Sequence, residues 1–433
     1  MKKLCVLGLG YIGLPTAALF ATHGIAVHGM DINLDIVKTV QRREVHIEEP
    51  GLKTVVVQAL ETGQLTVSNK VEPADFFIIA VPTPSKKDEY GEFEGKKYKL
   101  SDMQAVTSAA ESIVPFLNRG NLVILESTSP VRTTVDLIKP ILEKSGLKTG
   151  SDFYLAYSPE RVLPGQILKE LVDNSRVIGG IDRGSAERGR ELYSAFVKGE
   201  IILTDSTTAE MVKLMENTYR DVNIAIANEF TLLAERFGVN VWEAIEIANL
   251  HPRVKILKPG PGVGGHCIAI DPLFFVEAAP DITNVIYSSR ARNDQMPKFV
   301  VEKVMDIVKD IKNPIIACLG LTYKADVNDT RESPALEIIE KLCVFGYQVR
   351  AFDPFVKSLP ILVCELTSSL TEALKDADLL ILLVDHKLFK ELTPEILSNM
   401  RRRRIFDTRN IFRASIWNQT ANEIFYLGAP KLK

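Results

Sequence analysis

Cysteine is scarce in this sequence, and the few cysteines form no pattern that would hold a metal or a disulfide framework. There are five among 433 residues, an odd number, and no two follow the Cys-x-x-Cys spacing. Scattered cysteines of this kind are typical of a reducing compartment and argue against both a zinc knot and a disulfide-stapled secreted domain. The first ten residues begin a strand and lack the charged and apolar regions of a secretory signal. We therefore expect a cytoplasmic protein.

Long apolar runs and an excess of one charge are also missing. No stretch reaches the roughly 18 apolar residues of a membrane-spanning helix. The 52 basic side chains nearly balance the 55 acidic ones, and the formal net charge is -3. This balance favours neither nucleic acid nor a membrane surface as a partner. The basic run Arg401 to Arg404 is short and precedes an apolar pair, which is more typical of a solvated strand entry than of an interaction tail.

The composition that remains is that of a globular protein, with 46% apolar and 25% charged residues and a length suited to two or three domains. Short apolar runs alternate with amphipathic segments in both halves of the chain. The runs span 4–9, 25–30, 76–81, 122–125 and 153–157, then 315–319, 348–352, 379–384 and 404–406. This alternation predicts βαβ units with parallel sheets and helices on both faces.

The middle of the chain has a different pattern. Thr207 to Gly238 has apolar residues at helical spacing and ends at a glycine, and a second helical stretch follows Val241. We therefore predict an α/β protein in which two doubly wound Rossmann-like domains are joined by a central helical domain. The expected boundaries are 1–205, 206–305 and 306–433, and the helical domain is the candidate subunit interface.

A glycine-rich turn follows the first predicted strand. Gly8, Gly10 and Gly13 have the GxGxxG spacing before a helix, which permits a tight turn, close approach of a pyrophosphate and close helix packing. Asp31 ends the second strand, where its carboxylate can accept hydrogen bonds from an adenosine ribose and repel a 2′-phosphate. The combination predicts dinucleotide binding with a preference for NAD over NADP. The alternative is a glycine turn without a ligand.

Other polar residues also end predicted strands, where the ligands of open α/β sheets bind. The hydroxyls of Thr83 and Thr128 face either a ligand or the backbone of a turn. Glu160 is either a general base that acts through water or half of a Glu160–Arg161 surface pair. Asp353 ends a strand in the second half without a preceding phosphate turn. That half therefore holds either the nucleotide of a substrate or a purely structural repeat.

Cys267 follows a glycine-rich loop, residues 260–265, and Asp271 lies four residues later. If Cys267 starts a helix, the helix N-terminus favours its thiolate and Asp271 lies one turn away. The alternative is a buried structural cysteine.

The long helix carries a polar stripe of Lys213, Asn217 and Arg220, which faces either solvent or a ligand. His251 and Arg253 are suited to contacts with anions or hydroxyls. No metal-ligand spacing involves the histidines and cysteines of this region, so we expect no metal.

A series of motifs includes these residues and extends along nearly the whole chain. They are GLGYIGLP at 8–15, VPTP at 81–84, ESTSP at 126–130, SPERVLPG at 158–165, KLMENTYRDVNIAIANE at 213–229, HPR at 251–253, PGVGGHCIAIDP at 261–272, GLTYKADVNDTRESPA at 320–335 and DTRN at 407–410. In content and order the series resembles the nucleotide-sugar 6-dehydrogenases, the family that includes UDP-glucose dehydrogenase. A series of this length is highly specific.

The resemblance implies an NAD-dependent four-electron oxidation of the primary alcohol of a UDP-sugar to a carboxylate. Cys267 would add to the aldehyde from the first oxidation, a second NAD would take hydride from the thiohemiacetal, and water would cleave the thioester. Lys213 would stabilise oxyanion charge and shuttle a proton. Asn217 would hold a water or an oxyanion, Asp271 would orient and activate, and Glu160 would relay protons.

The resemblance also implies which positions contact the ligands. For the substrate they are Arg161, Val162, Lys213, Asn217, Arg220, His251, Arg253, Gly264, Tyr323, Lys324 and Arg409. For NAD they are Gly8, Gly10, Tyr11, Ile12, Gly13, Asp31, Thr83, Thr128 and Arg331. Members of the family are usually dimers or larger, with His251 and Arg253 reaching a neighbouring subunit's site, so we expect a homodimer or a dimer of dimers.

The cysteine loop departs from that of the UDP-glucose enzymes, which typically have an aromatic residue before the glycine pair and Pro-Lys-Asp after the cysteine. Here Val263 and residues 268–271, Ile-Ala-Ile-Asp, occupy these places, and His266 precedes Cys267. This pattern implies UDP-N-acetyl-D-mannosamine as the substrate, with UDP-N-acetylglucosamine and UDP-glucose as alternatives. A two-electron hydroxyacid-type dehydrogenase would not need Cys267. A non-catalytic NAD-binding scaffold would need neither Cys267 nor Lys213.

Overall fold

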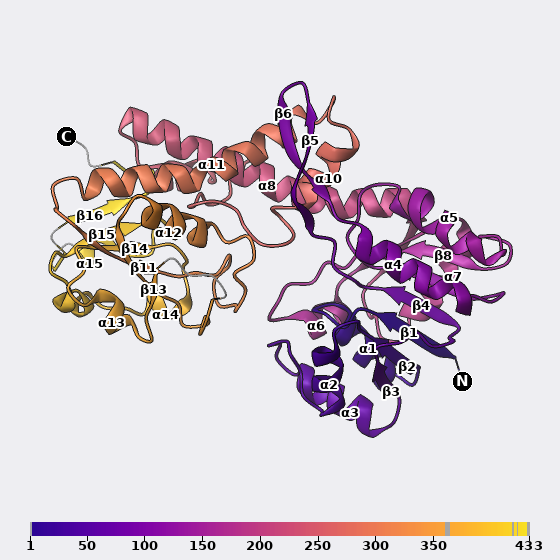
Figure 1. Ribbon diagram of the computed structural model, residues 1–433. Helices are drawn as coiled ribbons and strands as arrows, with labels where there is room; N and C mark the ends of the chain where they lie inside the picture. The colour runs from indigo at the N-terminus through magenta and orange to yellow at the C-terminus, as the bar shows by residue number, and fades with distance from the viewer. Residues whose placement is uncertain (1, 360–363, 418–419, 422, 431–433) are drawn as a thin grey trace. The chain divides into compact units, whose positions relative to one another are not determined.

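The computed structural model describes residues 2–359, 364–417, 420–421 and 423–430. They form two compact units, Met1–Glu216 with Leu273–Ile282, and Asn217–Pro272 with Thr283–Lys433. Each unit contains one large sheet (Figure 1). The long helix predicted at 207–238 is α8 (Ser206–Phe237), which contributes residues to both units. It ends at Gly238, whose φ of +73° is the left-handed conformation that glycine adopts at low cost.

The first unit contains an eight-stranded sheet in the order β10-β9-β8-β7-β4-β1-β2-β3. Its strands are β1 (Lys3–Leu7), β2 (Ala26–Met30), β3 (Leu65–Ser68), β4 (Phe76–Ile79), β7 (Leu122–Leu125), β8 (Tyr154–Tyr157), β9 (Arg176–Gly180) and β10 (Ile201–Asp205). All pairs between β3 and β8 are parallel, but β9 is antiparallel to β8. The predicted strands β1, β2, β4, β7 and β8 are thus parallel as expected, and β9, which was not among the predicted apolar runs, departs from this arrangement at one edge. β9 runs antiparallel to β8 because the segment that connects them holds no crossover helix. It holds only the seven-residue helix α6 (Ile167–Asp173), which packs against α1.

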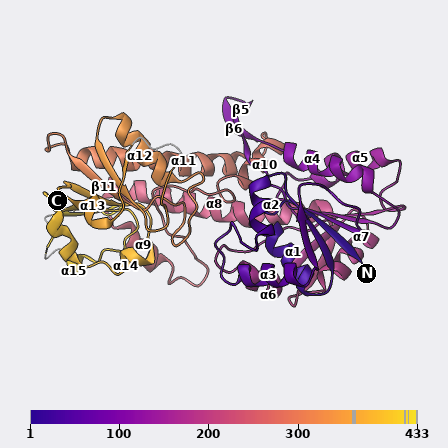
Figure 2. The same cartoon turned by 60° about the horizontal axis from the view of Figure 1, so that its bottom comes forward.

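Helices cover both faces of this first sheet (Figure 2). Alternate residues of β1 enter different apolar clusters, because successive side chains of a strand point to opposite faces. Leu4 and Val6 pack with residues of α1 and α3, whereas Cys5 and Leu7 pack with residues of α4 and α5. The helices are α1 (Gly13–Thr22), α2 (Leu34–Gln41), α3 (Leu52–Glu61), α4 (Gln104–Ile113), α5 (Lys139–Leu142) and α7 (Arg183–Tyr193).

The second unit contains a six-stranded sheet in the order β13-β12-β11-β14-β15-β16, with every pair parallel. Its strands are β11 (Ile315–Leu319), β12 (Gln348–Phe352), β13 (Glu365–Leu366), β14 (Leu379–Leu382), β15 (Arg404–Asp407) and β16 (Glu423–Tyr426). Its helices are α9 (Val241–Ala248), α11 (Asn284–Ile307), α12 (Pro334–Val344), α13 (Leu370–Leu374), α14 (Lys387–Lys390) and α15 (Ala414–Trp417), and α10 (Asp271–Ala278) begins in it. The doubly wound fold of both halves and the helical middle agree with the prediction.

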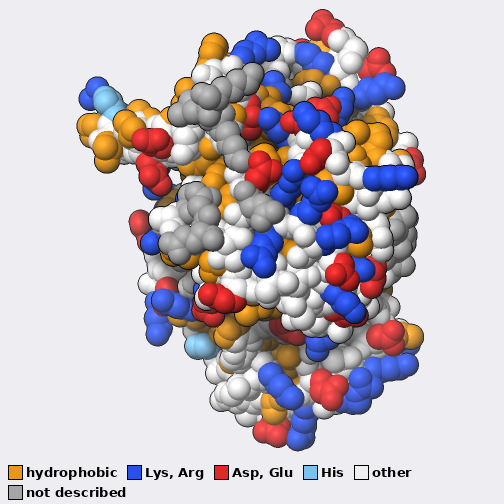
Figure 3. All heavy atoms as spheres, turned by 90° about the vertical axis from the view of Figure 1, so that its left-hand side faces the viewer, with side chains coloured by type: hydrophobic (Ala, Val, Ile, Leu, Met, Phe, Trp, Pro, Cys, Tyr) orange, Lys and Arg blue, Asp and Glu red, His pale blue; other side chains and the backbone are white. Residues whose placement is uncertain are grey.

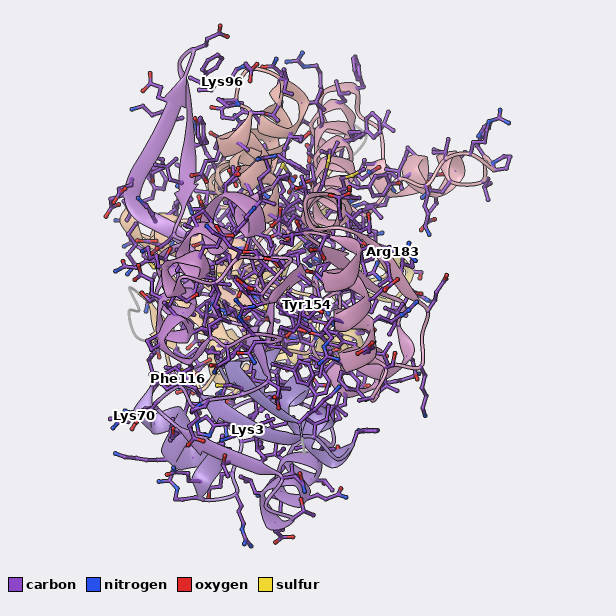
Figure 4. The ribbon with its side chains drawn as sticks, turned by 90° about the vertical axis from the view of Figure 1, so that its right-hand side faces the viewer. Lys3, Lys70, Lys96, Phe116, Tyr154 and Arg183 are labelled. Carbon is purple, nitrogen blue, oxygen red and sulfur yellow. The ribbon has the colours of Figure 1, made fainter. Side chains whose placement is uncertain are left out.

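A charged hairpin, β5 (Ser85–Phe93) and β6 (Lys96–Ser101), forms a separate two-stranded sheet in the first unit. Figure 4 labels Lys96 at its outer end and Tyr154 in the body of the large sheet. Basic and acidic side chains are interspersed on the face that Figure 3 shows. Among the described residues, no helix is long and apolar enough to cross a membrane.

Candidate active site

The glycine turn of the first unit has the shape that its spacing predicts. Gly8 has a φ of +94°, and a Cβ at Gly13 would lie 1.8 Å from the Gly8 carbonyl oxygen, so both positions require glycine. A Cβ at Gly10 would meet no atom within 4 Å. The backbone is therefore open at Gly10, directly before the N-terminus of α1, where a pyrophosphate can approach.

Asp31 lies beside this turn. Its carboxylate accepts hydrogen bonds from the backbone N–H groups of Leu9 and Asn33, each at 2.8 Å. These bonds fix the acid at the end of β2, where a ribose of a bound dinucleotide would meet it. His46 is a neighbour that sequence reasoning missed: burial lowers its pKa, while the charge of Asp31 and the Leu9 backbone raise it. The turn and the acid together fit NAD.

Thr83 and Thr128 meet each other, as strand-end residues of adjacent β4 and β7 should. The Thr83 hydroxyl donates a hydrogen bond to the Thr128 carbonyl at 2.7 Å. This bond is the backbone contact that was one of the two alternatives, and it leaves the lone pairs of the Thr83 hydroxyl available to a ligand.

Glu160 does not form the surface pair with the Arg161 guanidinium that was one alternative. Its Oε1 atom accepts the Arg161 backbone N–H at 2.6 Å, whereas its other oxygen is ion-paired with Arg176. The Arg161 guanidinium binds Glu216 instead, at 2.8 Å. Arg176 was not singled out from the sequence, because it begins β9 and its partner Glu160 follows β8, 16 residues earlier.

The polar stripe on α8 is only partly a solvated face. Lys213 is 7% exposed, and no hydrogen bond or ion pair joins its ammonium to any side chain or carbonyl in the described part of the chain. Asn217, one turn further, is also buried, whereas Arg220 is exposed. An ammonium on a largely buried side chain, with no counter-ion among the described residues, is suited to an anionic group or a developing oxyanion on a ligand.

The partly buried Cys267 does not start a helix, so this condition for thiolate stabilisation is not met. Its carbonyl accepts the N–H groups of Ile270 (3.0 Å) and Asp271 (2.8 Å), which closes one turn before α10 begins at Asp271. The helix begins there because Pro272 has no N–H and is suited to a first helical turn. Asp271 does lie one turn from the cysteine, and its carboxylate accepts a 2.6 Å hydrogen bond from Asn217.

The glycine loop before Cys267 is held by two buried side chains that sequence reasoning missed. Asn228 of α8 accepts the Gly260 N–H at 2.9 Å, and Arg290 of α11 donates to the Val263 carbonyl at 3.3 Å. Arg290 is itself paired with Asp221 at 2.5 Å. Burial raises the pKa of Asp221 to about 6, although the charge of Arg290 lowers it. Helical spacing places Asp221 and Asn228 on α8, but it does not reveal their partners.

The same loop packs against the segment after β11. A Cβ at Gly264 would lie 2.1 Å from the Glu332 carbonyl oxygen, and one at Gly265 would lie 2.6 Å from the Tyr323 ring. Asp329 binds the Arg331 guanidinium at 2.6 Å and lies 3.6 Å from His266. These residues form one cluster in the second unit.

The remaining predicted substrate residues of the second unit lie in three places. Arg409 is ion-paired with Asp385 at 3.0 Å, and its guanidinium borders Gly260. Lys324, His251 and Arg253 are exposed. No cluster of three metal-ligating side chains occurs among the residues that the structure describes.

Comparisons with known proteins match this arrangement. The chain matches the UDP-glucose/GDP-mannose dehydrogenase family in three parts: the NAD binding domain over residues 2–197, the central domain over 207–295 and the UDP binding domain over 317–414. It is 48% identical to the UDP-N-acetyl-D-mannosamine dehydrogenase of Methanocaldococcus jannaschii, over 99% of this chain and 97% of that protein. It is 44% identical to an NDP-N-acetyl-D-galactosaminuronic acid dehydrogenase of Ralstonia solanacearum, over 95% of this chain and 97% of that protein. The structure superimposes on the UDP-N-acetyl-mannosamine dehydrogenase Cap5O from Staphylococcus aureus with a TM-score of 0.90 and 45% identity, covering 99% of both chains.

Proposed function

The chain belongs to the UDP-glucose/GDP-mannose dehydrogenase family, and we propose that it oxidises UDP-N-acetyl-D-mannosamine to UDP-N-acetyl-D-mannosaminuronate through a thioester on Cys267. It is an NAD-dependent oxidoreductase that acts on the CH–OH group of a nucleotide sugar. The observation that carries the thioester proposal is the turn between Cys267 and Asp271. It sets a nucleophile one turn from a buried carboxylate whose position is fixed by Asn217.

In the proposed mechanism the chain's own residues bind the substrate and stabilise the negative charge that develops on it. The bound cofactor supplies the hydride acceptor for each of two oxidations, so two NAD are consumed per sugar. Between them, the Cys267 thiolate adds to carbon 6 of the aldehyde, and the thiohemiacetal that forms keeps the intermediate bound. The ammonium of Lys213, which has no partner among the described residues, stabilises the oxygen that becomes negative at each stage.

Thioester hydrolysis completes the proposed reaction. Water adds to the acyl carbon, the carbon–sulfur bond breaks, and the Cys267 thiolate leaves. Asn217 and Asp271 orient the thioester and the water, and Glu160 accepts a proton from that water. The products are one carboxylate and the regenerated thiolate.

We assign a separate role to each of the three regions that match the family. Residues 1–205 bind NAD through the glycine turn and Asp31, residues 206–305 carry Lys213 and Cys267, and residues 306–433 bind the UDP of the substrate. The open backbone at Gly10 supports the first assignment. The packing of the cysteine loop against Tyr323 and Glu332 supports placing the sugar-linked end of the nucleotide near this loop.

The proposed assembly is a homodimer through α8. Large apolar side chains recur along this helix within the second unit and remain exposed: Tyr219, Ile226, Phe230, Leu233 and Phe237. Their spacing of three, four and seven residues makes one stripe that a second copy of the same helix could cover. Replacing Phe230 with Asp should yield a monomer by sedimentation velocity.

The substrate is tested by comparing UDP-N-acetylmannosamine, UDP-N-acetylglucosamine, UDP-N-acetylgalactosamine and UDP-glucose under one condition. The names of the relatives and the residues Val263, His266 and Ile268 support N-acetylmannosamine, for which we expect a kcat/KM well above the others. The Ralstonia relative makes the galactosamine epimer the alternative to include. A higher kcat/KM with any of the other three sugars would overturn the assignment.

A further inference from the structure

Arg176 of β9 is buried between two carboxylates of the first unit. Its Nη1 atom lies 3.2 Å from Glu126 Oε1, and its Nη2 atom is ion-paired with Glu160. The same guanidinium donates to the Ser158 hydroxyl at 2.8 Å and stacks 4.0 Å above the Tyr193 ring. The Tyr193 hydroxyl in turn donates to Glu126 Oε1 at 2.9 Å. Elements β7, β9 and α7 thus converge on one cation.

One cation cannot neutralise two carboxylates, and the three side chains have little exposure to solvent. The side chains of Arg176, Glu126 and Glu160 are 4%, 0% and 11% exposed. Arginine stays protonated in proteins, so the cluster of Arg176, Glu126 and Glu160 has a net charge of −1 unless one of the two carboxylates is protonated. The cluster therefore has two states, which differ by a proton and by how the arginine is shared.

Glu126 is the member that accepts this proton. Its Oε2 atom is buried and has no hydrogen-bond partner among the described residues, whereas Glu160 keeps some solvent exposure and accepts the Arg161 N–H. Burial raises the pKa of Glu126 to about 7, against the lowering effect of Arg176; Glu160 raises it further and the Tyr193 hydrogen bond lowers it. These are the charged and titratable groups that face Glu126 from β9, α7 and the loop after β8.

We propose that Glu126 is a positioning residue that, through the shared Arg176, controls how tightly the Glu160 carboxylate is held during thioester hydrolysis. The inference rests on the proton-accepting role proposed for Glu160. When Glu126 is protonated, Arg176 binds Glu160 alone, which immobilises and neutralises it as a proton acceptor. When Glu126 is ionised, the arginine is shared and Glu160 is freed to accept the proton of the attacking water.

The test is the pH profile of turnover in wild type, Glu126→Gln and Tyr193→Phe. Glutamine keeps an oxygen for Arg176 and Tyr193 but cannot ionise. Wild type should gain activity as the pH rises through about 7, whereas Glu126→Gln should stay at the low-pH level, roughly tenfold slower at pH 8. Its KM values and the first hydride transfer, followed as NADH in a single turnover, should be unchanged. Glu143→Gln removes a carboxylate from the same unit, outside this cluster, and is the matched control.

Tyr193→Phe keeps the ring beneath Arg176 but removes the hydrogen bond that lowers the pKa of Glu126, so the rise in activity should move to higher pH. This variant decides the question if Glu126→Gln does not fold. A wild-type pH profile in either variant that folds would overturn the inference. Failure of the proposed function is distinguishable, because one NADH per sugar would appear in wild type whatever the Glu126 variants do.

Discussion

The two sheets begin with the same construction and use it differently. In the first, Gly8 (φ +94°) follows β1, and Leu9 donates its N–H to Asp31, directly after β2, at 2.8 Å. In the second, Gly320 (φ +93°) follows β11, and Leu321 donates its N–H to Asp353, directly after β12, at 2.6 Å. The strand, the left-handed glycine and the buried acid form a structural repeat.

The two constructions differ in the segment after the turn and in the other groups that bind the acid. After Gly8 the chain enters α1 at Gly13, but after Gly320 the next helix begins only at Pro334. Asp353 also binds the buried ring of His386, at 3.0 Å. Burial raises the pKa of Asp353, but His386 and the backbone donors hold it below its usual value. An acid at this position is therefore not sufficient evidence of a ribose site, and the immediate helix N-terminus is the feature that separates the two halves.

The largest expected effect is in the glycine-rich entry into α1, which the second half lacks. Gly13→Ala would place a Cβ against the backbone oxygen of Gly8, a contact that no side-chain rotation relieves. We expect a loss of about 3 kcal/mol in unfolding free energy and loss of NAD binding. Gly10→Ala meets no atom, so the protein should keep its stability while NAD affinity falls. Chemical denaturation and NAD titration measure both, and an equally stable Gly13→Ala would refute this account of the turn.

A smaller effect is expected on the unfolding free energy when the acid of the second half, Asp353, is replaced. Asp353→Asn weakens the bond to His386 and three backbone contacts in a buried place, which should cost about 2 kcal/mol of unfolding free energy. Because the pKa of Asp353 is depressed, its contribution is present above about pH 4 and is lost as the pH falls below that value. Denaturation at several pH values should therefore show the gap between variant and wild type narrowing in acid. The NAD-to-NADP preference should not change, and a changed preference would contradict a structural role.

Asp31→Asn provides the matched substitution in the first half. Removing the charge beside the ribose should lower the NAD-over-NADP ratio of kcat/KM about tenfold, or about 1.4 kcal/mol. An unchanged ratio would show that Asp31 does not face the ribose. The two Asn variants together decide whether the repeated acids have different functions.

Much of the fold followed from local sequence. The apolar runs that predicted β1, β2, β4, β7 and β8 are rich in β-branched and aromatic residues, and the glycine spacing predicted the turn. The strand β3 (LTVS) and the charged hairpin β5–β6 were not predicted, because their side chains alternate with exposed polar residues or are mostly polar. Such strands are stabilised by their neighbours and carry weak signals of their own.

The residues of the candidate site also fall into predicted and missed ones. Features that depend on near neighbours in sequence were predicted, such as the left-handed turn at Gly8 and the place of Asp271 one turn after Cys267. The Glu126–Arg176 pair was not, because its members lie 50 residues apart and meet only through the order of β7, β8 and β9. The sequence left open whether Cys267 starts a helix; the helix begins at Asp271, four residues later, where Pro272 is suited to its first turn.

The thioester on Cys267 is tested most directly by counting products in a complete turnover. NADH, remaining UDP-sugar and carboxylate are measured together, with Cys267→Ser as the control. The account predicts two NADH per carboxylate and no free aldehyde, and a steady turnover in Cys267→Ser that is lower by orders of magnitude with NAD still bound. One NADH per sugar with release of the aldehyde, or near-normal turnover of Cys267→Ser, would contradict it.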